Sequence, residues 1–257
     1  MALIRNQIFN EDCLKTMSQM DDGEIDLIVT SPPYDDLRNY KGFSFDYQKT
    51  FQEMYRVLKE GGVLVWVIGD SSKDGDESGT SFSHALYAKS IGFKLLDTMI
   101  WNKGSFAFPA KNTYHQVFDY MFVFSKGKPA TTNFICDRKN LYVGSRGASG
   151  RNKDGERNTG KSTVRNEYGK RFNIWNYPIG GGHSATDKIA YEHPAIFPEQ
   201  LAEDNILSWS NEGDTVYDPF MGSGTVAKMA KKNNRLYIGS EISAEYCDII
   251  KRRLNEE

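Results

Sequence analysis

Short apolar runs alternate along the chain with segments whose apolar residues recur at helical spacing. Several of these runs lack polar interruptions, which is typical of strands in a parallel sheet that is buried on both faces. Two runs, 93–101 and 116–124, are expected to pair antiparallel at a sheet edge. The strands are predicted at 3–9, 25–29, 63–68, 93–101, 116–124, 214–217 and 235–239.

Helices are expected between these strands, where apolar residues recur every three or four positions. The segment 48–59 is amphipathic, and Gly61 and Gly62 are expected to end it. A shorter amphipathic segment runs from Asp12 to Met20. Because strands alternate with helices, the sequence predicts an α/β fold with a mostly parallel sheet. The further helices are predicted at 82–91, 198–209 and 226–232 and from Ser243 onward.

The run at 25–29 ends in Thr30-Ser31-Pro32-Pro33-Tyr34. Two consecutive prolines remove two backbone donors and fix two φ angles, so the strand cannot continue and the turn is stiff. Ligands of open α/β sheets bind at this carboxyl edge of the strands. A hydroxyl, outward-pointing carbonyls and an aromatic ring suit a planar base with an exocyclic amino group. The alternative is a rigid turn with a tyrosine that only packs.

A second turn, Asp218-Pro-Phe-Met-Gly-Ser-Gly-Thr225, lies between a predicted strand and a helix. Gly222 and Gly224 let the backbone approach a ligand closely, and the helix start offers unpaired N–H groups. The turn lacks the third glycine of the dinucleotide fingerprint, and its acid would repel a pyrophosphate but attract an ammonium or sulfonium. Glu241 ends the next strand, where an acid commonly binds a ribose diol. Together these features describe a nucleoside that carries a cationic amino-acid tail.

Basic residues are concentrated in one segment, although the net charge of the 257 residues is only −2. Between positions 138 and 171, ten basic residues minus three acids leave an excess of seven. The segment has little apolar periodicity, so it cannot bury a core of its own and is expected to be mobile unless bound. It is interpreted as an arm that folds onto phosphates, with a solvated surface loop as the alternative. The basic residues are Arg138, Lys139, Arg146, Arg151, Lys153, Arg157, Lys161, Arg165, Lys170 and Arg171.

The three cysteines, Cys13, Cys136 and Cys247, are scattered along the chain. Their number and spacing argue against a disulfide framework and a zinc site, so no metal is expected and a reducing cytoplasm is the default. No secretory signal is visible, and no run approaches the ~20 apolar residues of a membrane span. No membrane partner is therefore expected.

The motifs TSPPY at 30–34 and DPFMGSGT at 218–225 resemble the two signatures of the amino-group DNA methyltransferases that use S-adenosylmethionine. Further similarity lies at 10–14, 55–62 and 193–201, and the order of the two signatures is similar to that of the β class. The resemblance implies a doubly wound, mostly parallel sheet of seven strands, with helices on both faces.

The resemblance also implies a division of the chain into three parts. A catalytic half would span 1–101, and a cofactor-binding half would span 191–257. Between them, 102–190 would hold the edge strands and a target-recognition insert, and the basic segment lies there.

The same resemblance implies how S-adenosylmethionine would bind. Asp218 would face its ammonium group, Glu241 would take its ribose hydroxyls, and Asp12 would lie near its adenine ring. The residues expected to bind the cofactor are Asp12, Cys13, Thr30, His193, Pro194, Phe197, Asp218, Pro219, Phe220, Gly222, Ser223, Gly224, Thr225, Glu241 and Ile242.

The residues expected to act on the target base are Ser31, Pro32, Pro33 and Tyr34. By resemblance, Ser31 and the Pro32 carbonyl would hold the amino group, and Tyr34 would stack on the flipped base. Families that methylate N4 of cytosine commonly carry SPPY, and those that methylate N6 of adenine carry DPPY or NPPY. Ser31 therefore favours cytosine, with adenine as the alternative. Methylation at carbon 5 would need a cysteine nucleophile, typically after a proline, and no cysteine here follows a proline.

Double-stranded DNA is the expected partner, and the cytoplasm of a prokaryote or a phage-infected cell is the expected location. The recognition sequence, a homodimer and a separately acting restriction endonuclease are left open. Two alternatives come from other classes: a DNA-binding protein that has lost catalysis, and a methyltransferase for RNA or a protein glutamine.

Overall fold

A computed structural model describes residues 4–33, 45–106, 113–146, 151, 153–156 and 163–255. Three residues with predicted roles, Tyr34, Arg157 and Lys161, lie outside the described residues. The chain divides into two compact units, Met1–Asn133 with Asn173–Glu257, and Phe134–Phe172.

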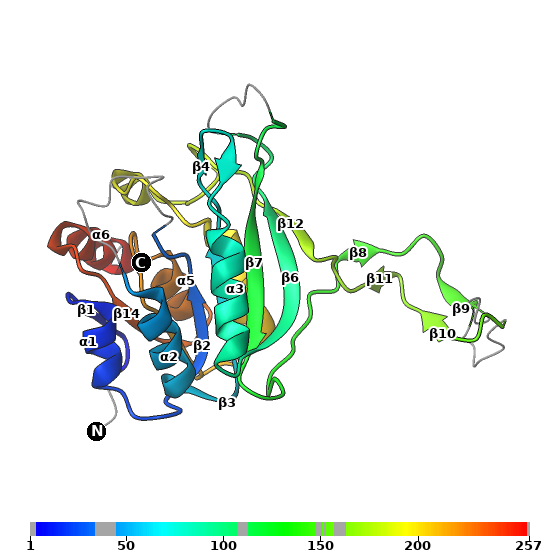
Figure 1. Ribbon diagram of the computed structural model, residues 1–257, viewed down its shortest axis with the longest axis horizontal. Helices are drawn as coiled ribbons and strands as arrows, with labels where there is room; N and C mark the ends of the chain where they lie inside the picture. The colour runs from blue at the N-terminus through cyan, green and yellow to red at the C-terminus, as the bar shows by residue number, and fades with distance from the viewer. Residues whose placement is uncertain are drawn as a thin grey trace. The chain divides into compact units, whose positions relative to one another are not determined.

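The larger unit is built on one sheet, which has eight strands in the described part of the chain (Figure 1). Neighbouring strands are parallel except for the two pairs that involve β7. The strands are, in spatial order, β1 (Gln7–Phe9), β14 (Leu236–Ser240), β13 (Thr215–Asp218), β2 (Ile25–Thr30), β3 (Leu58–Ile68), β7 (Phe118–Ser125), β6 (Lys94–Asn102) and β12 (Ile174–Asn176). A small hairpin, β4 (Ser72–Lys73) and β5 (Asp76–Glu77), follows β3.

The predicted mostly parallel, doubly wound sheet is confirmed, with one strand more than the seven expected. β6 and β7 are antiparallel neighbours, as predicted. They do not form the sheet edge, however, because the three residues of β12 pair in parallel with β6 and lie outside it.

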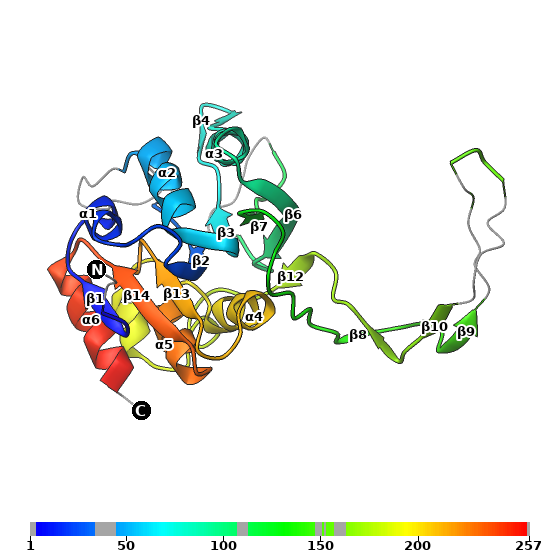
Figure 2. The same ribbon diagram turned by 90° about the horizontal axis from the view of Figure 1, so that it is seen from below.

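Helices cover both faces of the sheet (Figure 2). On one face, α1 (Cys13–Ser18), α2 (Tyr47–Val57) and α3 (Thr80–Ser90) close a core that includes Phe51, Met54 and Trp66. On the other face lie α4 (Glu199–Trp209), α5 (Thr225–Lys232) and α6 (Ala244–Asn255), preceded by the 3₁₀ turn η1 (Ile189–Glu192). Among the described residues, no helix has the length and apolar character that crossing a membrane requires.

The end of α2 differs from the sequence prediction. The Asp46 side chain caps the helix by accepting a hydrogen bond from the Lys49 N–H. The helix ends at Val57, because Leu58 already pairs with Ile25 in the sheet. The prediction that Gly61 and Gly62 end the helix is wrong, since both lie inside β3. A side chain at Gly62 would come within 2.7 Å of the Leu58 side chain, so packing explains this glycine.

The smaller unit, Phe134–Phe172, consists of two short antiparallel pairs of strands. They are β8 (Arg138–Lys139) with β11 (Tyr168–Gly169), and β9 (Gly144–Arg146) with β10 (Thr163–Arg165). Apolar side chains such as Leu141 and Val164 are exposed by 93% and 75%, as expected for a segment without a core of its own.

Candidate active site

Two strand tips that are far apart in the sequence lie side by side. β13 and β2 are parallel neighbours, with Tyr217 opposite Ile28. Immediately beyond this pairing, the Thr30 hydroxyl donates a 2.6 Å hydrogen bond to the Asp218 carboxylate, across 188 positions of sequence. Both residues are buried. The sheet therefore joins the TSPPY motif to the DPFMGSGT motif directly.

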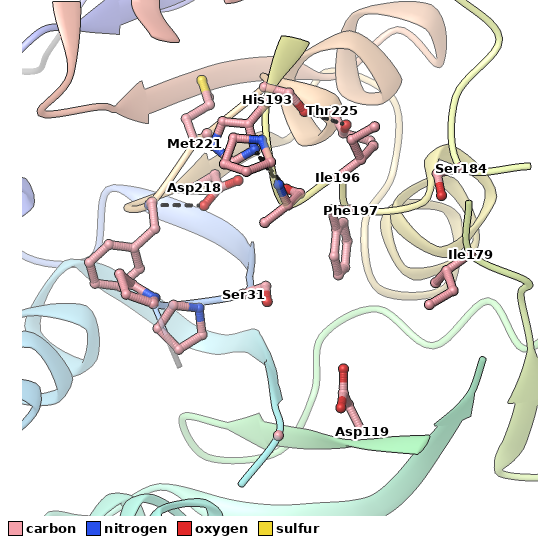
Figure 3. A pocket seen from close by; sticks show the side chains of 18 of the residues that line it. Ser31, Asp119, Ile179, Ser184, His193, Ile196, Phe197, Asp218, Met221 and Thr225 are labelled. Atoms are coloured by element: carbon pink, nitrogen blue, oxygen red, sulfur yellow. Dashed lines mark hydrogen bonds between the residues drawn. The ribbon is translucent and has the colours of Figure 1, made fainter. Parts of the chain in front are cut away.

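Both motifs line one cleft of about 1300 Å³ (Figure 3). This volume exceeds that of a usual small-ligand pocket, so the cleft has room for two ligands. Of the residues predicted from the sequence, those that line it are Asp12, Cys13, Ser31, Pro32, Pro33, His193, Pro194, Phe197, Asp218, Pro219, Phe220, Gly222, Ser223, Thr225, Glu241 and Ile242. Thr30 and Gly224 do not line it; Thr30 is buried and bonded to Asp218, and Gly224 is the N-cap residue of α5.

The turn between β13 and α5 has a backbone that favours glycine at two positions. Gly222 has φ +52°, and a Cβ there would lie 3.2 Å from the His193 ring. Gly224 has φ +79°, and a Cβ there would lie 2.7 Å from Ile250. His193 is held over the turn, because its Nδ1 contacts the backbone of Ala195, 2.8 Å from the carbonyl oxygen, and its ring packs edge-on against Tyr246. Close approach from both sides fixes the path of the turn.

Two buried acids give the cofactor side of the cleft its charge. The Glu241 carboxylate accepts one backbone N–H from Gly222 and one from Ser243, each at 2.8 Å. Burial, with a smaller contribution from the nearby Glu241 charge, raises the pKa of Asp218 to about 7 although the Thr30 and Phe220 hydrogen bonds oppose the shift. Burial also raises the pKa of Glu241 above its ordinary value. A cationic ligand would relieve the repulsion between these two carboxylates, and an anionic ligand would increase it. The two acids therefore fit a sulfonium with an ammonium tail and do not fit a pyrophosphate.

A buried arginine that the sequence analysis missed supports the turn from behind. Arg253 is 1% exposed, and its guanidinium donates to the Ser223 carbonyl at 2.6 Å and to the Thr225 hydroxyl at 3.1 Å. It lies three positions after the buried Ile250, on the same face of α6. That helical spacing could have identified Arg253 as an inward-facing residue.

The same guanidinium also donates to two acids. Its guanidinium pairs with Glu199 at 2.8 Å and with Asp187 at 3.0 Å, and Lys228 contacts the same two carboxylates. Burial alone would raise the pKa of Asp187, but hydrogen bonds and the Arg253 charge hold it at about 2. The four charges connect α4, α5 and α6 with the segment before His193.

The other side of the cleft is formed by residues at the ends of β6 and β7. Trp101, Lys103 and Asp119 line it, together with Phe197. Figure 3 shows Asp119 and Ser31 at the same cavity, with Phe197 beside them. The sequence analysis did not identify Trp101, Lys103 or Asp119 as site residues, because no spacing pattern links them.

Cysteine chemistry is disfavoured in the cleft. Cys13 is the cysteine that lines it in the described part of the chain, and it is buried at the start of α1. Burial raises the pKa of its thiol to about 12, so it is not a thiolate near neutral pH. Asp12 caps α1 by accepting the Leu14 N–H at 2.8 Å.

The predicted DNA-binding residues lie in the smaller unit. Lys139, Arg151, Lys153, Arg165 and Lys170 are exposed there, and Arg146 lies in β9. Three basic side chains organise the unit itself: Arg138 stacks on Phe172, Lys170 lies over Phe134, and Arg171 pairs with Asp137. Tyr142 is 62% exposed.

A doubly wound sheet with both motifs at one cleft defines a Rossmann-like methyltransferase domain. A family model described as DNA methylase, of the N6 and N4 type, matches residues 25–252. The orphan methyltransferase M.BamHII of Bacillus amyloliquefaciens is 62% identical over 237 residues, which cover 91% of this chain and 89% of that protein. The chain therefore belongs to the DNA methylase family, whose methyl donor is S-adenosylmethionine.

Two solved structures share the fold. PvuII DNA methyltransferase, a cytosine-N4-specific enzyme, superposes with a TM-score of 0.68 at 18% identity and covers 100% of this chain and 95% of its own. M1.HpyAVI, in complex with S-adenosylmethionine, gives a TM-score of 0.63 at 24% identity and covers 97% of this chain and 98% of its own.

Proposed function

We propose that this DNA methylase transfers a methyl group to the N4 amino group of cytosine, at a specific sequence in duplex DNA, after flipping the base out of the helix. The observation that carries the proposal is the shared cleft of Ser31 and the turn at Asp218. A base inside a duplex cannot reach such a cleft, so the target nucleotide must leave the stack.

When bound, S-adenosylmethionine supplies a methyl group on a sulfonium, which is a good leaving group. Glu241 would take the ribose hydroxyls, since each of its oxygens uses one backbone N–H and retains acceptor capacity. Asp218 would face the ammonium group, and Asp12 would lie near the adenine ring with Cys13 beside it. The remaining cofactor residues are proposed to be Thr30, His193, Pro194, Phe197, Pro219, Phe220, Gly222, Ser223, Gly224, Thr225 and Ile242.

The target amine would be held at the tip of β2. Pro32 and Pro33 have no N–H, so the backbone there presents acceptors without competing donors. The Ser31 hydroxyl and the Pro32 carbonyl would accept the amino hydrogens, orient the nitrogen lone pair and stabilise the positive charge that develops on nitrogen. Alignment of this kind is the main requirement when the leaving group is already good. A stacking role for Tyr34 remains a prediction.

The smaller unit is proposed to bind DNA through its exposed basic residues, as a part of the target-recognition insert at 102–190. Phosphate contacts would supply affinity and orientation, and base contacts would supply the sequence choice. The relative M.BamHII is described as an orphan methyltransferase. This favours activity of the present chain, too, without a dedicated restriction endonuclease. A homodimer and a cytoplasmic location remain predictions.

Adenine N6 is the second candidate target, because both bases present an amino group to the same acceptors. Ser31 at the first position of the SPPY motif favours cytosine. The deciding experiment exposes unmodified plasmid DNA to the protein with S-adenosylmethionine and measures modified nucleosides by mass spectrometry. N4-methylcytosine is expected; N6-methyladenine would replace the proposal by its alternative, and the absence of both would overturn it.

A further inference from the structure

A largely buried ion pair lines the cleft on the side opposite the turn between β13 and α5 (Figure 3). The Lys103 ammonium lies 2.7 Å from the Asp119 carboxylate, with 20% and 7% of the two side chains exposed. Lys103 follows β6 directly, and its N–H donates to the Val117 carbonyl at 2.8 Å. The pair is therefore held by the backbone of both strand ends.

Burying such a pair costs desolvation energy that mutual attraction rarely exceeds. Its position suggests a use, because it lines the cleft instead of lying within the apolar core. Among the described residues, Lys103 Nζ donates one of its three hydrogens, to Asp119. The ammonium thus has donors available to a ligand.

The register of the sheet places this pair two strands away from Ser31 and two residues further along the strand direction. Thr30 is opposite Trp66 in β3, and Ile68 of β3 is opposite Tyr120 in β7. Ser31 is therefore level with Val67 of β3, and Asp119 lies two residues further along the strands. Two strand spacings of about 4.8 Å and two residues of about 3.3 Å place the two backbones about 12 Å apart, which leaves room for one heterocyclic base with hydrogen bonds at both ends.

Rigid apolar side chains complete the chamber. Trp101 is 5% exposed, its indole N–H donates to the Tyr177 carbonyl at 2.8 Å, and its ring packs edge-on against Phe197 at 6.2 Å. An apolar chamber with a few fixed polar groups is typical of a site that holds and orients a planar ligand.

We propose that the Lys103–Asp119 pair is a second contact for the flipped base, in which the Lys103 ammonium donates to the ring acceptors and Asp119 positions it. When Ser31 holds the amino group of cytosine, the same edge of the ring presents N3 and the 2-carbonyl oxygen as acceptors. Adenine presents only N1 there, followed by a C–H group. Lys103 therefore favours cytosine, and this selectivity rests on the proposed N4 activity.

The test compares Lys103→Met with wild type in single-turnover methylation of the mapped target duplex. We expect the rate to fall about 10- to 100-fold, which is the usual range for one hydrogen bond to a charged group. S-adenosylmethionine affinity measured by calorimetry should stay within twofold, because Lys103 is remote from the cofactor turn. Lys128→Met, at an exposed lysine, is the matched control and should behave as wild type.

A substrate analogue separates base contact from structural support. On a duplex whose target is a 2-aminopyridine C-nucleoside, which keeps the amino group and the N3 acceptor of cytosine but lacks the 2-carbonyl oxygen, wild type should slow as Lys103→Met does, and Lys103→Met should be slowed little further. Asp119→Asn should slow methylation of the cytosine duplex but not of the analogue. The proposal would be overturned if the rate losses caused by the variant and by the analogue multiply when the two are combined. It would also be overturned if Lys103→Met methylates the cytosine duplex at the wild-type rate. If the mapped target is adenine, the N4 proposal fails by itself, and a 1-deazaadenine duplex tests the same lysine.

Discussion

The turn around Gly222 and the basic unit Phe134–Phe172 differ in how many packing contacts fix the conformation of the backbone. In the turn, two glycines, a buried arginine and a histidine ring fix the backbone from several sides. In the basic unit, two short strand pairs and a few cation–aromatic contacts hold a segment whose apolar side chains are exposed. The first region is ordered by its own packing. The second has little reason to be ordered before a partner neutralises its charge.

The largest effect is expected from removing the buried guanidinium. Arg253→Met leaves Glu199 and Asp187 with one cation in place of two, and should lower the free energy of unfolding by about 3–5 kcal/mol. Denaturant unfolding monitored by circular dichroism measures this change. The neighbouring Arg252→Met is the control, since Arg252 is exposed and pairs only at the surface. Equal, small decreases for both variants would show that the turn does not depend on this network.

A methyl group at Gly222 should weaken cofactor binding without unfolding the protein. Gly222→Ala combines a φ of +52° with a close approach to His193. The added methyl group should displace the turn from the position that the ligand needs and lower S-adenosylmethionine affinity roughly tenfold, which is about 1.4 kcal/mol. Gly213→Ala shares the positive φ but meets no neighbour within 4 Å, so it controls for backbone strain. If calorimetry finds the same S-adenosylmethionine affinity for Gly222→Ala and Gly213→Ala, the close approach of His193 does not shape the turn.

Cofactor affinity should depend on pH through Asp218. Its pKa lies near 7 in the free protein, against an ordinary value of 3.8, and a cationic ligand favours the ionised form. Binding therefore releases a proton, and affinity should rise with pH up to about 7, by at most about tenfold per pH unit, and then level off. The free protein becomes less stable as the pH rises from about 4 to about 7, because the neutral carboxyl is the form that tolerates burial. Asp218→Asn should remove the part of the pH dependence that is centred near pH 7; a slope that persists there would assign it to another group.

Changes in the basic unit should leave stability almost untouched and alter only DNA binding. Replacing Arg151, Lys153 and Arg165 by Gln should reduce the slope of log K against log[salt] by about 0.9 for each phosphate that is no longer neutralised, about 2.7 for all three. Fluorescence anisotropy at several salt concentrations measures the slope. Lys89, Lys128 and Lys251, also exposed, supply a control triple variant. If the two triple variants have equal slopes, the basic unit does not contact DNA phosphates more than any other exposed surface.

The same contrast explains what could be predicted from the sequence. Uninterrupted apolar runs identified the central strands, and the special composition of the two turns identified the residues that line the cleft. The end of α2 was misjudged, because sheet pairing at Leu58 overrode the expected helix stop at Gly61. Arg253 was missed although its spacing from Ile250 marks it as inward-facing, because the acids that it pairs with lie in distant segments. Lys103 and Asp119 were missed because no spacing pattern links them to the two motifs. Only the folded sheet brings those segments together.

The central claim is that the tip of β2 acts on a base while the turn after β13 holds the methyl donor, so the two functions should separate in one variant. Ser31→Ala, assayed by single-turnover methylation of duplex DNA and by calorimetry with S-adenosylmethionine, tests this directly. We predict a rate lower by about 100-fold or more with cofactor affinity within twofold of wild type. An unchanged rate, or a parallel decrease of rate and affinity, would contradict it.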